Sequence, residues 1–134
     1  LKNLGAKKAW VVHGADGLDE ITTTAKTFVA TLDEDGHIEE TTLSPADFGL
    51  ETAAPEKLLG GDAEENAKAL RAVLEGQKCA YRDIVLANTA AVLVIHGSAD
   101  DIQSGVAKAA DAIDTGHAHD TLKDYVAFSR EASA

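Results

Sequence analysis

The sequence has 134 residues, of which 23 are acidic and 12 are basic, so its formal net charge is −11. This length is sufficient for one hydrophobic core. The acidic balance, with no basic run longer than Lys7-Lys8, argues against nucleic acid and anionic membranes as partners. No apolar run reaches the roughly eighteen residues of a membrane span, and the first residues lack a signal-peptide pattern, so we expect a soluble protein. The single cysteine, Cys79, cannot form an internal disulfide and fits a reducing cytoplasm.

The N-terminal residues combine a helix end with a buried strand. Residues 1–4 (LKNL), followed by Gly5, are typical of the last turn of a helix that a glycine closes. Residues 9–12 (AWVV) form a short continuous apolar run, which predicts a parallel strand buried on both faces. Such a strand needs neighbouring strands on both sides and helices above and below.

The next segment predicts an antiparallel hairpin. Residues 21–32 (ITTTAKTFVATL) and 37–43 (HIEETTL) are rich in Thr, Val and Ile, and the DEDG sequence at 33–36 is typical of a turn. The same stretch places acidic residues at two positions of an EF-hand calcium loop. Thr42, however, stands where that loop needs a bidentate glutamate. We therefore interpret residues 33–36 as a hairpin turn.

The remainder of the chain predicts four helices, over residues 63–75, 83–96, 100–114 and 121–130. Asp62 and Glu65 form a capping-box pattern before the first helix. The second helix is apolar nearly all round, which predicts burial between other elements. In the last helix we expect an inward-facing side made of Leu122, Tyr125, Val126 and Phe128.

One buried parallel strand and one hairpin provide too little sheet to cover four helices with apolar stripes. We therefore expect an α/β fold with one parallel strand, an antiparallel hairpin and about four helices, entered at the end of a crossover helix. On this interpretation residues 1–134 form a single partial domain, the C-terminal part of a larger α/β domain. A self-contained α+β fold is the alternative.

The strongest candidate for a functional site is the sequence HGADGLDE at residues 13–20. It follows the carboxyl end of the predicted strand, where ligands bind in open α/β sheets. Gly14 and Gly17 allow sharp turns, and Asp19 and Glu20 offer hard oxygen ligands. Adjacent carboxylates suit Mg²⁺, which completes its shell with waters and phosphate oxygens. Alternatively, Asp19 and Glu20 are solvated acids at the start of the next strand.

Several histidines are weaker candidates. His13 can approach a ribose or a phosphate, or it can form structural hydrogen bonds. His117, His119 and Asp120 have the spacing of a small metal-binding cluster, although their place between two helices after Gly116 favours a solvated loop.

Two asparagines lie inside predicted helices, where an apolar or charged residue is easier to accommodate. We expect the side chains of Asn66 and Asn88 to bond to nearby backbone groups, and we assign neither to the site.

The order of several segments carries a family resemblance. HGADGLDE, the Thr-rich strand, TLSPADFGLE, LLGGDAEENAKALRAVLEG and RDIVLANTAAVL resemble the C-terminal portion of anthranilate phosphoribosyltransferases. The resemblance covers about Leu1 to Ser129. It implies transfer of phosphoribosyl from phosphoribosyl pyrophosphate (PRPP) to anthranilate, with release of pyrophosphate, in tryptophan biosynthesis. It also implies a homodimeric full-length enzyme that uses Mg²⁺, with Asp19 and Glu20 as ligands of a second Mg²⁺ that contacts the pyrophosphate.

The resemblance further implies that important parts of such an enzyme lie outside these residues. The family's GTGGD loop for PRPP, its KHGNR-type segment and its N-terminal helical domain are not found in the sequence. We therefore expect the isolated chain to be inactive. Two alternatives stay open. One is a non-catalytic interaction module that associates through a strand edge and apolar helix faces. The other is part of an enzyme related to pyrimidine nucleoside phosphorylases.

Overall fold

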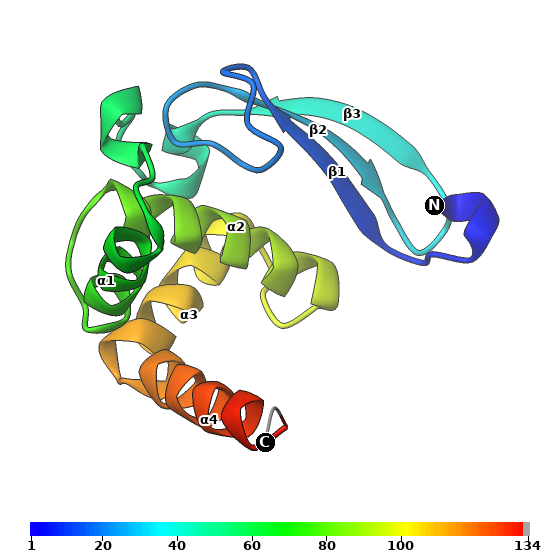
Figure 1. Cartoon of the computed structure of the whole chain (residues 1–134). Coiled ribbons are helices and arrows are strands. Elements are labelled where there is room, and N and C mark those ends of the chain that lie inside the picture. The colour runs from blue at the N-terminus through cyan, green and yellow to red at the C-terminus, as the bar shows by residue number, and fades with distance from the viewer. Residues whose placement is uncertain (133–134) are drawn as a thin grey trace.

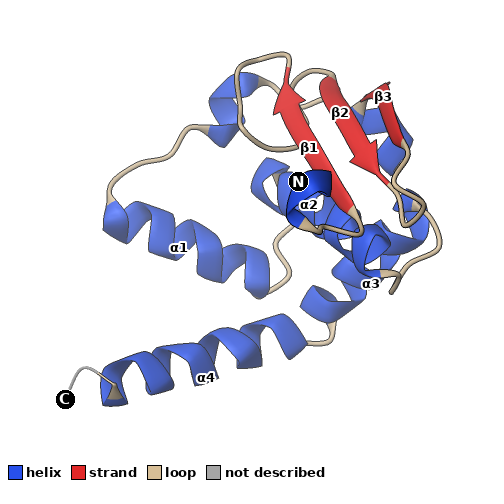
Figure 2. Cartoon of the chain, turned by 90° about the vertical axis from the view of Figure 1, so that its right-hand side faces the viewer, coloured by secondary structure: helices blue, strands red, loops and turns tan. Residues whose placement is uncertain are grey.

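A computed structural model describes residues 1–132. Its strands are β1 (Ala9–Gly14), β2 (Thr27–Leu32) and β3 (Ile38–Leu43), and its helices are α1 (Ala63–Leu74), α2 (Ala80–His96), α3 (Ile102–Asp114) and α4 (His117–Glu131). Short 3₁₀ turns span Lys2–Leu4, Pro45–Phe48 and Pro55–Leu58. The sheet lies at one end of the molecule, the helices gather on one side of it, and α4 lies at the opposite end (Figures 1 and 2).

The three strands form one sheet in the order β1-β2-β3, and both pairings are antiparallel. The predicted hairpin is confirmed, with Gly36 at φ 82° and its amide bonded to the Asp33 carbonyl at 3.1 Å. The α/β class is also confirmed, but the prediction that residues 9–12 form a parallel strand is wrong for the pairing seen in residues 1–132. β1 is joined to β2 by a loop instead of a crossover helix, and such a connection produces antiparallel pairing.

The two faces of the sheet differ. Trp10 and Val12 of β1 pack against a core formed by Ile21, Phe48 and three alanines of α2, Ala87, Ala90 and Ala91. The opposite face is open, and Val11 is 58% exposed there. The expected burial of this strand on both faces is not seen within the described part of the chain, because no helix of residues 1–132 covers the outer face (Figure 1).

A second core joins the helices. It contains Val73 of α1, Leu86 of α2, and Ala109 and Ile113 of α3, all buried. At the edge of this core, Arg82 is only 2% exposed, and its two terminal nitrogens contact the two oxygens of Asp114 at 2.9 Å each. This pair ties the N-terminal part of α2 to the C-terminal end of α3.

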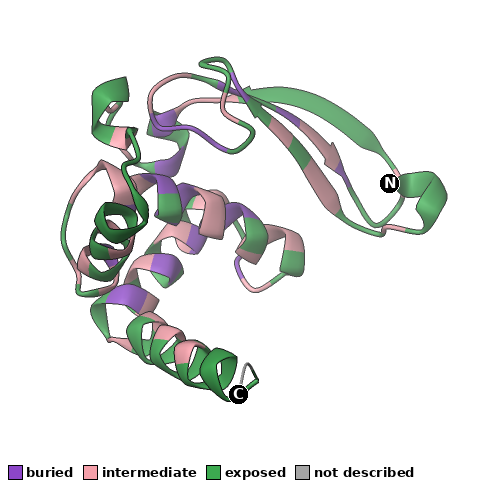
Figure 3. Cartoon of the chain, viewed as in Figure 1, coloured by how far each residue is buried: buried purple, intermediate pink, exposed green. Residues whose placement is uncertain are grey.

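The last helix departs from the sequence prediction in two ways. It begins at His117, four positions before Thr121, with Gly116 as its N-cap at φ 84°. Tyr125 and Phe128, expected to face inward, are 68% and 70% exposed, while Leu122 and Val126 are half-buried. Figure 3 shows the reason, since little of the described chain packs against α4.

The predicted cap at the start of α1 is confirmed, whereas α2 begins at Ala80, three positions before the predicted start. Asp62 accepts hydrogen bonds from the Glu64 and Glu65 amides, and Glu65 accepts one from the Asp62 amide, so the capping box is formed. The predicted helix end at residues 1–4 is a single 3₁₀ turn closed by Gly5 at φ 88°. Among the described residues, no helix is long and apolar enough to cross a membrane.

Candidate functional site

The acidic sequence lies in the loop that joins β1 to β2, at one end of the sheet (Figure 1). The strand predicted from residue 21 begins only at Thr27, so residues 21–26 belong to this loop. They are nevertheless well covered, since Ile21, Thr22 and Thr23 are each at most 1% exposed. Thr22 bonds through side chains instead of through a strand ladder, since its amide donates to the Thr27 hydroxyl and its hydroxyl donates to Asp16, which explains why the β-rich composition of this segment does not produce a strand.

Asp16, which was not predicted as a site residue, holds the loop together through its side-chain hydrogen bonds. Its Oδ2 accepts hydrogen bonds from the Thr22 hydroxyl at 2.6 Å and from the Thr24 hydroxyl, and its Oδ1 accepts one from the Leu18 amide at 3.2 Å. Partial burial disfavours the charged carboxylate, but these hydrogen bonds outweigh that effect and lower the pKa of Asp16. The loop is therefore folded around an ionised carboxylate.

Asn88 of α2 fastens the other side of the loop. Its Oδ1 accepts a hydrogen bond from the Ile21 amide at 3.0 Å, and its Nδ2 donates to the Ile21 carbonyl at 2.8 Å and to the Ile84 carbonyl at 2.9 Å. The sequence-based expectation of backbone bonding is thus confirmed for Asn88. It is confirmed for Asn66 as well, which exchanges two 2.9 Å hydrogen bonds with the backbone of Gly61.

Asp19 and Glu20 lie between these two anchors and are both exposed. No Lys, Arg or His within residues 1–132 forms an ion pair with either of them. Burial raises the pKa of Glu20, and the negative charges of Asp19 and Asp16 raise it further. The loop therefore presents an excess of negative charge to solvent, and a bound cation would relieve it.

The donor set fits a divalent ion that brings other ligands with it. Within residues 1–132, no third His, Cys, Asp or Glu offers a ligand atom in one compact group with Asp19 and Glu20. The chain can thus supply one or two carboxylates, and waters or phosphate oxygens must complete the shell. Mg²⁺ is the common ion with this preference, whereas Zn²⁺ and Ca²⁺ sites draw more ligands from the protein.

His13 lies on the outer face of the sheet, where its ring stacks on Phe28 with the centroids 6.4 Å apart and the planes at 23°. This contact favours the structural interpretation of His13. His117 and His119 lie in the first turn of α4, two positions apart, and residues with that spacing do not share a helix face. His119 lies 3.9 Å from Asp120, and His117 lies 3.1 Å from the Thr115 hydroxyl.

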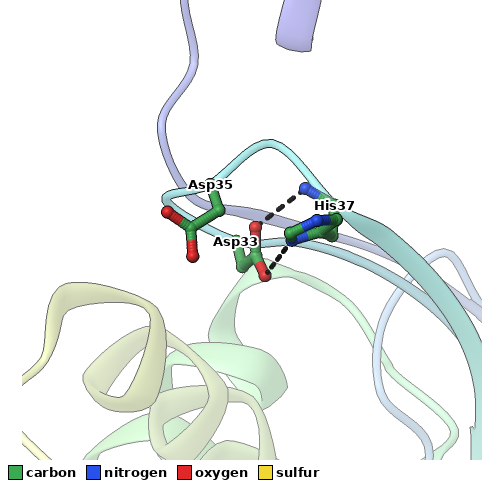
Figure 4. A group of neighbouring side chains, drawn as sticks. All are labelled: Asp33, Asp35 and His37. Atoms are coloured by element: carbon green, nitrogen blue, oxygen red, sulfur yellow. Dashed lines mark hydrogen bonds and ion pairs between the residues drawn. The ribbon is translucent and has the colours of Figure 1, made fainter.

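The hairpin turn contains a compact group of possible ligands, Asp33, Asp35 and His37, whose ligand atoms lie within 4.8 Å of one another (Figure 4). Asp33 accepts a hydrogen bond from the His37 amide at 2.8 Å and lies 3.3 Å from the His37 ring nitrogen. This backbone hydrogen bond is the main cause of the lowered pKa of Asp33. The turn thus accounts for the grouping of these exposed side chains.

With the geometry in place, the chain can be compared with known proteins. Residues 1–119 match the protein family described as "Glycosyl transferase family, a/b domain". The chain belongs to this family. It is 55% identical over 127 residues to the anthranilate phosphoribosyltransferase of Rhodospirillum rubrum, covering 95% of this chain and 36% of that protein. It is 54% identical over 129 residues to the one of Methylobacterium nodulans, covering 96% and 38%. The chain therefore spans less than two fifths of the length of these relatives.

Solved structures agree with these sequence matches. The anthranilate phosphoribosyltransferase of Thermus thermophilus superimposes with a TM-score of 0.84 at 35% identity, covering 96% of this chain and 37% of that one. The Saccharomyces cerevisiae enzyme in complex with PRPP and Mg gives 0.77 at 30% identity, covering 87% and 33%. The resemblance inferred from the sequence motifs is thus confirmed.

Proposed function

We propose that this chain is part of a phosphoribosyltransferase that transfers phosphoribosyl from PRPP to anthranilate and releases pyrophosphate, in tryptophan biosynthesis. Within that enzyme, the chain contributes Asp19 and Glu20 as ligands of a Mg²⁺ that contacts the pyrophosphate. The observation that carries the proposal is the pair of exposed carboxylates without a cationic partner in residues 1–132, fixed on a loop that Asp16 and Asn88 hold on either side.

A metal ion held by Asp19 and Glu20 would assist departure of the diphosphate. A departing diphosphate gains negative charge in the transition state, and a bound divalent ion stabilises that charge. Asp19 and Glu20 would hold the ion, and the hydrogen bonds of Asp16 would keep the loop from moving as charge develops. Burial and the charges of Asp19 and Asp16 raise the pKa of Glu20, and a bound cation would favour its charged form. The reaction requires no nucleophile from this loop.

The rest of the proposal concerns how the chain fits into the whole protein. We propose that residues 1–134 form one partial domain of an enzyme that is a homodimer in the cytoplasm, and that the isolated chain does not turn over substrate. Two surfaces support this view: the exposed aromatic rings of Tyr125 and Phe128, and the edge of β1 that pairs with no strand of residues 1–132. Such surfaces are normally covered.

A chimera tests the function. The chain replaces the matching segment of the Rhodospirillum rubrum relative, whose 55% identity favours correct packing. We expect the chimera to consume anthranilate only when PRPP and Mg²⁺ are present. The loss of anthranilate fluorescence measures this consumption. A folded chimera that leaves the fluorescence unchanged would contradict the proposal. Consumption of a pyrimidine nucleoside and phosphate would point instead to the related phosphorylase activity.

A non-catalytic interaction module is the second candidate, and the outer face of the sheet favours it. A shallow hollow of about 420 Å³ lies there, lined in part by Val11, His13 and Phe28. Val11 and Phe28 are more than half exposed. This candidate predicts stable association of the isolated chain with the remainder of the relative without any transfer reaction.

A further inference from the structure

We propose that Asn88 is a positioning residue that holds the Asp19–Glu20 pair in its metal-binding arrangement. This inference rests on the proposed function, because it assigns Asn88 to the same site. Asn88 itself faces the backbone and not the open side of the loop, so it acts through Ile21 rather than by contact with an ion.

The three hydrogen bonds of Asn88 use nearly all of the hydrogen-bonding capacity of its side-chain amide. The oxygen accepts from Ile21, and the nitrogen gives its two hydrogens to the Ile21 and Ile84 carbonyls. Asparagine is a poor residue for a helix interior, where it costs about 0.6 kcal/mol relative to alanine. Its place in the middle of α2 is therefore explained by the bonds that it makes and not by helix propensity.

The Ile21 amide belongs to the peptide bond that joins Glu20 to Ile21. A hydrogen bond to that amide, together with one to the Ile21 carbonyl, fixes the two peptide planes that follow Glu20. The Ile21 side chain is 1% exposed and packs with Ala87 and Ala90 of the same helix. The backbone directly after Glu20 is thus tied to a 17-residue helix by both hydrogen bonds and packing.

This connection affects metal binding through preorganisation. Residues that hold metal ligands in place, without touching the metal, commonly change its affinity by about 10-fold to 100-fold when they are replaced. Asp16 restrains the loop before Asp19, but Asn88 is the contact that restrains it immediately after Glu20. Without Asn88, the two carboxylates would sample more positions and pay a larger entropy cost on binding an ion.

The chain contains a matched control for this role. Asn66 of α1 makes the same pair of amide-to-peptide hydrogen bonds, with Gly61 as its partner. Gly61 lies before α1, and neither Asp19 nor Glu20 is joined to it by a hydrogen bond in residues 1–132. Replacing Asn66, which is exposed, removes two hydrogen bonds of the same kind without touching the acidic loop.

The test measures metal binding directly in the chimera with the Rhodospirillum rubrum relative. Mn²⁺ is titrated in the presence of pyrophosphate and followed by electron paramagnetic resonance, with an Asp19→Asn, Glu20→Gln variant to define binding elsewhere. We expect Asn88→Leu to weaken the Asp19- and Glu20-dependent binding by about 10-fold or more. Asn66→Leu is expected to leave it within about twofold. Asn88→Asp keeps an acceptor for the Ile21 amide and should give an intermediate loss.

Thermal unfolding of each variant separates a local effect from loss of the fold. If Asn88→Leu does not fold, the comparison of Asn88→Asp with Asn66→Asp decides the question. Equal Mn²⁺ affinity in the Asn88 and Asn66 variants would overturn the proposal. If the unsubstituted chimera binds no Mn²⁺ through Asp19 and Glu20, both the role of Asn88 and the metal site are overturned. Parent protein that binds Mn²⁺ through these residues but does not consume anthranilate would contradict only the proposed reaction.

Discussion

The carboxylate of Asp16 occupies the space into which a side chain on Gly14 would project. A Cβ atom built on Gly14 would overlap Asp16 Oδ1 and lie 3.1 Å from the Thr22 methyl group. Gly14 does not have a positive φ, so close approach is the reason for this glycine. Gly17 differs, because it has a φ of 98° and open space where a Cβ would lie. The two glycines of the acidic loop therefore serve different physical purposes.

Gly14→Ala is expected to displace Asp16 from the Thr22 and Thr24 hydroxyls. Overpacking of this kind costs about 1–3 kcal/mol of unfolding free energy and should also weaken Mn²⁺ binding. Gly17→Ala is the comparison, since it adds backbone strain of about 1 kcal/mol without a clash. Urea unfolding measures both values. A Gly14→Ala protein as stable as the parent, with unchanged Mn²⁺ affinity, would contradict the role given to Asp16.

Glu20→Gln should stabilise the protein at neutral pH while it weakens metal binding. The ionised carboxylate is disfavoured by burial and by the charges of Asp19 and Asp16, so its folded pKa lies above its ordinary value of 4.5. The destabilisation is absent below pH 4.5 and grows as the pH rises through the folded pKa. Because these side chains face solvent, we expect a gain of only about 0.5 kcal/mol. Unfolding curves at pH 4 and pH 7 without metal test this, and a gain that is larger at pH 4 would contradict it.

The Arg82–Asp114 pair should respond unequally to the removal of its two members. Asp114→Ala leaves a guanidinium that is 2% exposed without its carboxylate, whereas Arg82→Met leaves a carboxylate that is half exposed. An unpaired buried charge is costly, while an exposed one is solvated. We therefore expect Asp114→Ala to lower the Tm by several degrees more than Arg82→Met does. Equal Tm values for the two variants would argue against a buried ion pair.

The same pair predicts a pH dependence. The hydrogen bond from Arg82 is the largest cause of a lowered pKa for Asp114, with Lys78 contributing. The stability that this carboxylate provides is present above its ordinary pKa of 3.8 and is lost as the pH falls through the folded value. Part of the stability that the parent loses below pH 4 should therefore come from Asp114. In the Asp114→Ala variant, the free energy of unfolding should fall less steeply as the pH is lowered below 4.

The close crossing of α2 and α3 gives a further prediction. A Cβ on Gly105 would lie 3.0 Å from the Cα, Cβ and carbonyl oxygen of Ala90. Gly105→Ala gains about 1 kcal/mol in helix propensity but loses about 1–3 kcal/mol through overpacking, so we expect a net loss of about 1 kcal/mol. Ala107→Gly on the exposed side of α3 measures the propensity difference alone. A stabilised Gly105→Ala protein would show that α2 and α3 can move apart to accommodate the added methyl group.

Features specified by neighbouring residues could be predicted from the sequence. The turn at Asp33–Gly36 and the cap at Asp62 both depend on groups only a few positions apart, and both are present. The asparagines were recognised as backbone-bonding residues for the same reason. The partner of Asn88, however, is Ile21, 67 positions away, and no local pattern identifies such a contact.

Features that depend on distant packing were harder to predict. Residues 21–26 have strand-like composition, but the Thr22 hydroxyl bonds to Asp16 and the Thr22 amide to the Thr27 hydroxyl, so the segment becomes a loop. The exposed rings of Tyr125 and Phe128 follow an amphipathic pattern whose partner is not among residues 1–132. An apolar stripe predicts that a helix face can be covered, but it does not say by which element.

The central claim is that Asp19 and Glu20 bind a divalent ion in contact with a diphosphate. Crystals of the chimera grown with Mn²⁺ and PRPP, measured by anomalous diffraction, test it most directly. The account predicts an anomalous peak about 2.1 Å from a carboxylate oxygen of Asp19 or Glu20 and equally close to a pyrophosphate oxygen. PRPP and Mn²⁺ bound with both carboxylates turned away from every metal peak would contradict it.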